Sequence, residues 1–316
     1  MAINADRPHL WKLEIAASAD LFNAWFMNFA PATYRKTRLK TTEVVREALS
    51  LTNDPRSITP DVLAKYPNVL PTLRMSTAPP LARDRLIGLA HANKNLVLTM
   101  EEGSIPPRLQ KSVLADNLKS ICGILARLLD KDIFPWLETG KDPSEEERYR
   151  ASTIIADRLC GSVADPIIRN AQEHRQLALI EDYLRHRGYV KKPPAGGAGI
   201  RGMEPGTFAF RVNVPVGDEL KVNVPIDVVI QPKVVRKSGI PILIEAKSAG
   251  DFTNTNKRRK EEATKVHQLR AAYGDDAKLI LFLCGYFDGG YLGYEATEGL
   301  DWIWEHRIDD LLKLGI

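Results

Sequence analysis

The chain has 316 residues, 44% of them hydrophobic and 27% charged, which is long enough for two ordinary domains and typical of a globular protein. Its net charge of +4 does not by itself indicate a nucleic-acid-binding protein, and three widely spaced cysteines argue against a zinc or disulfide framework. The first ten residues lack the apolar core of a signal peptide, and no apolar run is long enough to cross a bilayer. We therefore expect a protein of the reducing cytoplasm with no membrane partner.

The first 150 residues are predicted to form a mainly helical region. Apolar residues recur at helical spacing from Leu10 to Phe29, and Thr41 is a possible cap for a second helix. A short helix is expected to begin at Thr59-Pro60, because proline is tolerated at the first helical position. Longer helices are expected over 82–101 and 109–129, and an acidic helix start is expected at 145–147.

The pattern changes to strands in the second half of the chain. A helix is predicted over 165–187 and a Pro- and Gly-rich loop over 191–202. The elements predicted after this loop are strands over 207–214, 224–230 and 240–247, a helix over 256–273, strands over 277–286 and 291–294, and a closing helix over 299–314. This order predicts an α/β domain over 151–316, with a mixed sheet flanked by helices.

Asp227 and the triplet Glu245-Ala246-Lys247 lie at the facing ends of two predicted neighbouring strands. A hairpin turn at 236–239 would place Asp227 opposite position 248, and a small error in the turn would bring it closer to Glu245. Glu245 and Lys247 are two residues apart on a strand, so they share a face. Acidic groups on such apolar strands are costly to bury unless a divalent cation and a phosphate pair with them. The pattern therefore indicates a metal-dependent nuclease, and the alternative is an ion pair at the strand ends.

Mg²⁺ is the cofactor that these side chains favour, with Mn²⁺ as a possible substitute. Asp227, Glu245 and the carbonyl of Ala246 offer the oxygen ligands that Mg²⁺ prefers. Lys247 could orient the attacking water and offset charge in the transition state.

A local excess of cations follows the two strands. Residues 231–260 hold eight cations and two anions, a balance of +6 that suits a polyanionic partner such as double-stranded DNA. Asn can bind adenine and Arg can bind guanine through two hydrogen bonds. The candidate DNA contacts are Asp251, Thr253, Asn254, Asn256, Lys257, Arg258 and Arg259. The alternative for these residues is ordinary helix capping and a solvated basic surface.

Residues 165–287 resemble the PD-(D/E)xK nuclease core, with Ile226-Asp227 as a variant of Pro-Asp, a proline one position early at 225, and Glu245-Ala246-Lys247 as the second half of the motif. Over most of its length the chain also resembles the XamI-type type II restriction endonucleases. This second resemblance rests on residues 21–26, 73–80 and 245–254.

The resemblance implies a Mg²⁺-dependent type II restriction endonuclease that hydrolyses double-stranded DNA at a short palindrome, such as GTCGAC, and leaves 5′-phosphate ends. It also implies that a glutamate from the helix before the sheet joins the metal site, for which Glu173 is the first candidate and Glu181 the second. A palindromic site favours a homodimer, and the helical region 1–150 would then serve DNA recognition or dimerisation.

Two alternatives stay open, namely another nuclease on the same core without strict sequence specificity and a DNA-binding module without catalysis. An enzyme acting on a small phosphorylated substrate is disfavoured, because the Gly-rich segment 196–202 lacks the Lys-Ser/Thr ending of a phosphate-binding loop.

Overall fold

The chain folds into two compact units in the computed structural model. One unit, here called the sheet unit, comprises Met1–Phe29 and Arg169–Ile316, and the other, the helical unit, comprises Ala30–Ile168. This grouping differs from the expected division at residues 150 and 151 in two ways: the first 29 residues belong with the C-terminal part of the chain, and the helical unit extends to Ile168. The structure describes residues 2–194, 199–217, 222–252 and 255–316, and gives the backbone alone at 255–259.

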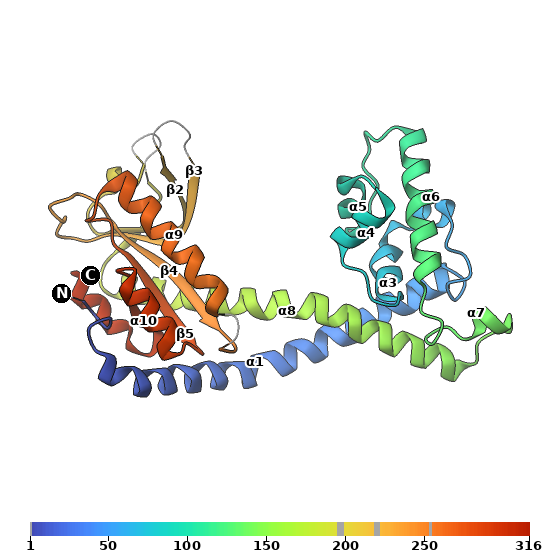
Figure 1. The fold of residues 1–316 in the computed structure, drawn as a ribbon, viewed down its shortest axis with the longest axis horizontal. Helices are drawn as coiled ribbons and strands as arrows, with labels where there is room; N and C mark the ends of the chain where they lie inside the picture. The colour runs from blue at the N-terminus through green and yellow to red at the C-terminus, as the bar shows by residue number, and fades with distance from the viewer. Residues whose placement is uncertain (1, 195–198, 218–221, 253–254) are drawn as a thin grey trace. The chain divides into compact units, whose positions relative to one another are not determined.

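Two long helices contribute residues to both units. They are α1 (Pro8–Leu51) and α8 (Glu145–His186), each continuous along its length (Figure 1). Neither these nor any other helix in the described part of the chain is both long and apolar enough to span a bilayer.

Short helices build the helical unit around apolar side chains such as Leu70, Leu86 and Leu125. The first of them begins at Pro60 as predicted, and Thr59 caps it by accepting the N–H of Val62 at 3.3 Å. The elements of this unit after α1 are α2 (Pro60–Lys65), η1 (Pro67–Val69), α3 (Leu70–Met75), α4 (Arg83–Ala90), α5 (Lys94–Glu101), α6 (Lys111–Leu128) and α7 (Trp136–Thr139).

Three predicted helix boundaries before the sheet are wrong. Thr41 lies inside α1, where its hydroxyl donates to the carbonyl of Arg38 at 3.0 Å instead of capping a new helix. The predicted helix over 82–101 is two helices, because His91 adopts a left-handed φ of 48° and ends α4. The helix predicted to start at Asp165 begins instead at the acidic segment at Glu145 and continues through Pro166.

A six-stranded mixed sheet forms the centre of the sheet unit, in the order β1-β2-β3-β4-β5-β6. The three central strands are antiparallel neighbours as predicted, and β5 and β6 continue the sheet parallel to β4. The bounds are β1 (Val190–Lys191), β2 (Thr207–Val216), β3 (Val222–Gln231), β4 (Ile242–Ala249), β5 (Leu279–Gly285) and β6 (Asp301–Trp304). The short η2 (Gly199–Gly202) precedes β2, and residues 195–198 of the predicted loop lie outside the described residues.

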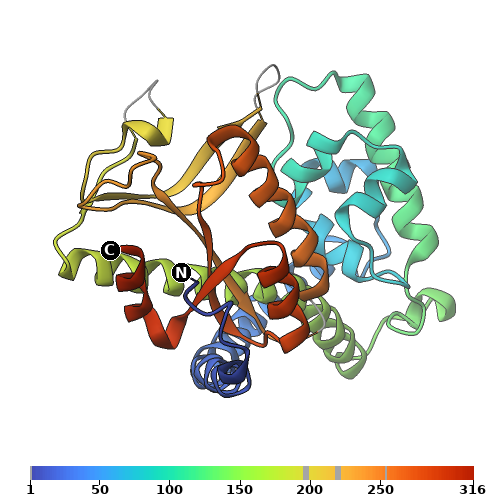
Figure 2. The same ribbon diagram turned by 60° about the vertical axis from the view of Figure 1, so that its left-hand side comes forward.

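Helices cover both faces of the sheet (Figures 1 and 2). On one face, α9 (Thr255–Tyr273) and α10 (Gly289–Thr297) pack through Val266, Leu269 and Leu292. On the other face, α8 packs through residues such as Ile180 and Leu184. The sheet is therefore buried on both sides, as the long apolar runs of β4 and β5 require.

Two predictions near the C-terminus are wrong. Residues 291–294 belong to helix α10 rather than to a strand, and the Asp288 side chain caps this helix through the N–H of Tyr291 at 2.6 Å. The predicted helix over 299–314 is β6 followed by η3 (Glu305–Leu314). Trp302 and Trp304 are fully buried on one face of β6 while Ile303 faces the other core, an alternation that only a strand produces.

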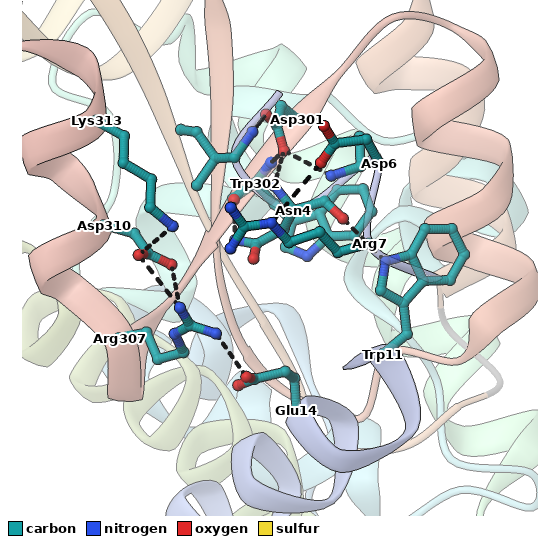
Figure 3. Close-up of polar contacts among 12 residues, drawn as sticks. Asn4, Asp6, Arg7, Trp11, Glu14, Asp301, Trp302, Arg307, Asp310 and Lys313 are labelled. Carbon is teal, nitrogen blue, oxygen red and sulfur yellow. Dashed lines mark hydrogen bonds and ion pairs between the residues drawn. The ribbon is translucent and has the colours of Figure 1, made fainter. Parts of the chain in front are cut away.

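The N-terminal segment is fixed to the sheet by β6. The carboxylate of Asp301 accepts the backbone N–H groups of Ile3, Asn4 and Ala5, and the Asn4 side chain donates to the carbonyl of Trp302 at 2.8 Å (Figure 3). Further along α1, Glu14 pairs with Arg307 of η3 at 2.7 Å (Figure 3). These contacts explain why the first residues of the chain belong to the sheet unit.

Candidate active site

The pairing of β3 with β4 brings Asp227 beside Glu245. Val228 pairs with Ile244 and Ile230 with Ile242. Asp227, which directly precedes Val228, therefore lies beside Glu245 rather than opposite position 248. The predicted turn is present, since Gly239 N–H donates to the Arg236 carbonyl at 2.8 Å. The predicted register is nevertheless wrong by three positions, because the chain between β3 and this turn is longer than the chain between the turn and β4.

The two strands separate where the candidate residues begin. The paired region ends at Val228 and Ile244, and the backbone N–H of Ala246 donates instead to the Asp227 carboxylate at 2.8 Å. The side chain of one strand thus replaces the missing ladder bond of the other. This separation holds the Asp227 carboxylate between the two strands, where their pairing ends, without leaving the Ala246 amide unsatisfied.

Glu245 is buried, and its two oxygens have different surroundings. Oε1 lies 2.9 Å from Nζ of Lys247 and 2.6 Å from Nζ of Lys265. Oε2 is buried without a hydrogen-bond partner among the described residues. An unpartnered carboxylate oxygen in such a place is costly unless a further positive group completes it.

The charges of this site perturb one another. Burial and the nearby Glu245 carboxylate raise the pKa of Asp227 to about 6. Burial alone would lower the pKa of Lys247, but the carboxylates of Glu245 and Glu262 outweigh it and raise this pKa, so the side chain remains an ammonium ion at neutral pH. The geometry therefore provides two facing carboxylates with a fixed cation beside them.

Helix α9 supplies two charged groups that the sequence analysis missed. Glu262 is buried, lies 3.7 Å from Lys247 Nζ and accepts a hydrogen bond of 2.7 Å from the Tyr291 hydroxyl. Lys265 contacts Glu245 as described above. A signal for Glu262 was available, because it precedes the buried Val266 by four residues and Leu269 by seven, which places it on the inward stripe of the helix.

Glu173 lies on α8 and pairs with Arg211 of β2 at 3.0 Å. Its charge contributes to the raised pKa of Asp227, and Gln176, three residues further along α8, donates to the carbonyl of Lys247 at 3.4 Å. Arg211 has a left-handed φ of 51°, an uncommon conformation for a residue with a side chain. The second candidate, Glu181, instead pairs with Arg185 and Lys191.

The candidate DNA contacts follow β4. Asp251 is exposed just after this strand, whereas Thr253 and Asn254 lie outside the described residues. The remaining four, Asn256, Lys257, Arg258 and Arg259, belong to the first turns of α9, where the backbone alone is described.

The donor set where β3 and β4 separate fits a hard divalent cation. No group of three or more His, Cys, Asp or Glu side chains in the described part of the chain is arranged to hold a metal ion. Asp227 and Glu245 nevertheless provide two facing carboxylates, one with an unpartnered oxygen, and Mg²⁺ commonly takes only one or two carboxylates from the protein. A cation between them would relieve the repulsion that raises the pKa of Asp227.

Comparison with known proteins assigns the chain to a family. The type II restriction enzyme SalI of Streptomyces albus G is 57% identical over 313 residues, which are 99% of this chain and 99% of that enzyme. The type II restriction enzyme XamI of Xanthomonas campestris pv. amaranthicola is 29% identical over 213 residues, 66% of this chain and 70% of that enzyme. A solved structure from Vibrio cholerae matches with a TM-score of only 0.28 and 14% identity, covering 90% of this chain and 56% of the other, which is too low to assign a fold. The XamI restriction endonuclease family model matches residues 53–304, so the chain belongs to the XamI restriction endonuclease family.

Proposed function

We propose that this protein is a type II restriction endonuclease that hydrolyses phosphodiester bonds of double-stranded DNA at a short palindromic site and leaves 5′-phosphate ends. Family membership supports the class of activity, and both curated relatives carry the name of type II restriction enzymes. The observation that carries the site assignment is the convergence of Asp227, Glu245 and Lys247, with Ala246 N–H bound to Asp227 at 2.8 Å and Lys247 bound to Glu245 at 2.9 Å.

The proposed catalytic core is of the PD-(D/E)xK type. Its expected order is a helix, three antiparallel strands, a helix and a parallel strand, which corresponds here to α8, β2-β3-β4, α9 and β5. Asp227 then stands for the first acid of the motif, and Glu245 and Lys247 stand for the second half.

The proposed cofactor is Mg²⁺, with Mn²⁺ as a substitute, held by Asp227, Glu245 and the carbonyl of Ala246. When bound, the ion would polarise the phosphate and lower the pKa of a water molecule. Lys247 keeps its proton because two carboxylates raise its pKa, so its role is to donate hydrogen bonds to the water and to the charged phosphate oxygens rather than to act as a base.

Glu173 is proposed to assist at the same site. It is partly exposed, it is close enough to raise the pKa of Asp227, and it is paired with the exposed Arg211. A Glu173 carboxylate released from Arg211 would add a negative group beside the metal ligands, and the freed guanidinium would favour a DNA phosphate.

DNA contact by the segment after β4 and dimer formation are also proposed. The segment holds amides and guanidinium groups suited to base edges and phosphates, namely Asp251, Thr253, Asn254, Asn256, Lys257, Arg258 and Arg259. A palindromic target such as GTCGAC favours a homodimer, and the proposed setting is the cytoplasm. The helical region at 1–150 is proposed to contribute DNA recognition or dimer contacts.

Digestion of a sequenced plasmid with Mg²⁺, followed by run-off sequencing of the ends, tests this proposal. Discrete fragments with one palindrome at every end are expected. Smeared or structure-dependent products would indicate a nuclease of another specificity, and DNA binding without cleavage would indicate a non-catalytic module. Asp227→Asn and Lys247→Ala should each abolish cleavage, whereas Glu181→Gln, a carboxylate on α8 paired with Arg185 and Lys191, should leave it unchanged.

A further inference from the structure

We propose that Lys265 is the counter-ion of Glu245 in the metal-free protein and that its ammonium group competes with a divalent cation for this carboxylate until DNA is bound. This inference rests on the proposed function, because it concerns the same site. It adds a positioning residue from α9 that lies outside the Glu-x-Lys motif and makes metal binding dependent on the DNA phosphate.

The contacts of Lys265 place its ammonium group between the two site strands. Nζ lies 2.6 Å from Glu245 Oε1 on β4 and donates to the carbonyl of Pro225 on β3 at 3.2 Å. Its distance to Glu245 is shorter than the 2.9 Å of the motif lysine, Lys247. Lys265 therefore neutralises Glu245 at least as directly as the residue that the motif identifies.

The two ammonium groups differ in how firmly they are held. Lys247 has carboxylates on two sides, Glu245 at 2.9 Å and Glu262 at 3.7 Å, and Glu262 is itself fixed by the Tyr291 hydroxyl. Among the described residues, Lys265 has one carboxylate contact and one neutral carbonyl contact. A divalent cation bound to Glu245 repels both ammonium groups, and Lys265 is the one with less to hold it in place.

Lys265 also has a route away from the carboxylate. Its side chain is 20% exposed, whereas that of Glu245 is 6% exposed, so the ammonium group can move toward solvent while the carboxylate stays. A DNA phosphate near the site would stabilise the displaced ammonium group. Metal binding and DNA binding would then strengthen each other. The metal ion releases the Lys265 ammonium group for the phosphate, and the phosphate stabilises that group after it has left Glu245.

The test measures Ca²⁺ binding by calorimetry on protein treated with a chelator, with and without duplex DNA. Lys265→Met keeps the apolar stem and removes the charge, and Lys265→Arg keeps the charge. Lys260→Met is the matched control, because Lys260 is an exposed lysine on the same helix.

Without DNA, Lys265→Met should bind Ca²⁺ roughly tenfold more tightly than the unchanged protein, the equivalent of one charge-assisted hydrogen bond. Lys265→Arg and Lys260→Met should stay within about twofold, which is well below that effect.

Two further measurements separate this role from a purely structural one. DNA should strengthen Ca²⁺ binding clearly in the unchanged protein and much less in Lys265→Met. The thermal midpoint of Lys265→Met should fall in chelator and recover with Ca²⁺, which shows that the variant is folded.

Unchanged or weaker Ca²⁺ binding by folded Lys265→Met would overturn the inference, even if plasmid digestion succeeds. If neither protein binds Ca²⁺ and the plasmid is not cut, the inference and the proposed function both fail.

Discussion

The hydroxyl of Tyr291 donates a hydrogen bond of 2.7 Å to Glu262, and Glu262 lies 3.7 Å from the ammonium group of Lys247. A residue of α10 thus orients a buried carboxylate of α9 that in turn holds a lysine of β4. Burial raises the pKa of Glu262 most strongly, while Lys247 and Tyr291 oppose this rise. The position of Lys247 is therefore set by residues that lie 15 and 44 positions later in the chain.

Tyr291→Phe should weaken this support for Lys247 without changing any side chain of β3 or β4. We expect a loss of about 1.5–3 kcal/mol in the free energy of unfolding, the range for a hydrogen bond to a charged group, and a lower kcat with little change in KM. Urea unfolding and steady-state cleavage measure the two effects. The control is Tyr273→Phe, whose hydroxyl donates to the neutral carbonyl of Pro215 at 2.9 Å. Equal kcat values for the two variants would contradict the supporting role of Tyr291.

Asp227→Asn should abolish cleavage and at the same time stabilise the metal-free protein at pH 7–8. The pKa of Asp227 is raised from 3.8 to about 6 by burial and by Glu245, so its ionisation is unfavourable in the folded state. The folded protein then retains a proton that the unfolded chain releases, and the free energy of unfolding falls as pH rises from about 4 to about 6. Thermal unfolding in chelator should show a higher midpoint for the variant at pH 8 and no difference at pH 4. A lower midpoint at pH 8 would contradict the raised pKa.

The same group predicts how metal binding responds to pH. A divalent cation requires the ionised form of Asp227, so protons compete with the metal below the pKa of about 6. The apparent Ca²⁺ affinity should fall about tenfold for each pH unit below this value, which corresponds to one proton released on binding. Calorimetry between pH 5 and pH 8 in buffers of different ionisation heat measures that proton. A flat profile across this range would be incompatible with Asp227 as a ligand.

Glu173→Gln should reduce cleavage by about 10–100-fold, the usual cost of losing a group that supports a metal site. The affinity for DNA in Ca²⁺ should change much less. Glu181→Gln is the matched control on the same helix, since its carboxylate is paired with Arg185 and Lys191. If both variants cleave at the same rate, Glu173 is an ordinary partner of Arg211 and not part of the site.

Asp301→Asn should destabilise the sheet unit, because Asp301 accepts the backbone N–H groups of Ile3, Asn4 and Ala5 and an amide nitrogen would face these donors (Figure 3). Loss of one such charged acceptor should lower the free energy of unfolding, measured with urea, by about 1.5–3 kcal/mol. Asp309→Asn serves as the control, because Asp309 is an exposed residue of η3 with a long contact of 3.4 Å to Arg187. A similar small change in both variants would show that the N-terminal contacts add little stability.

The sequence predicted the central elements of the sheet unit well. The strands of the antiparallel meander, helix α9 and β5 are present near their predicted positions, since their apolar periodicity is strong and local. The short strand expected at 291–294 and the first part of the closing helix were predicted wrongly, because a few apolar residues fit both the helical and the strand period, whereas residues 305–314 are helical. In β6, pairing with β5 decides the conformation.

The sequence likewise predicted only part of the candidate site. Residue types made Asp227, Glu245 and Lys247 candidates, and strand parity predicted that Glu245 and Lys247 share a face, because alternate strand residues do so. The register that brings Asp227 beside Glu245 depends on the connection at 232–241, in which the segment before the turn is longer than the segment after it. Sequence spacing does not reveal this difference. The contacts of Glu262, Lys265 and Tyr291 depend on how α9 and α10 pack against β4.

Local chemistry thus determined which groups can bind a cation and a phosphate, since that depends on the side chains themselves. Tertiary packing decided which of these groups meet, how far each is buried and therefore how strongly their charges interact, because these quantities depend on distances between segments far apart in the chain.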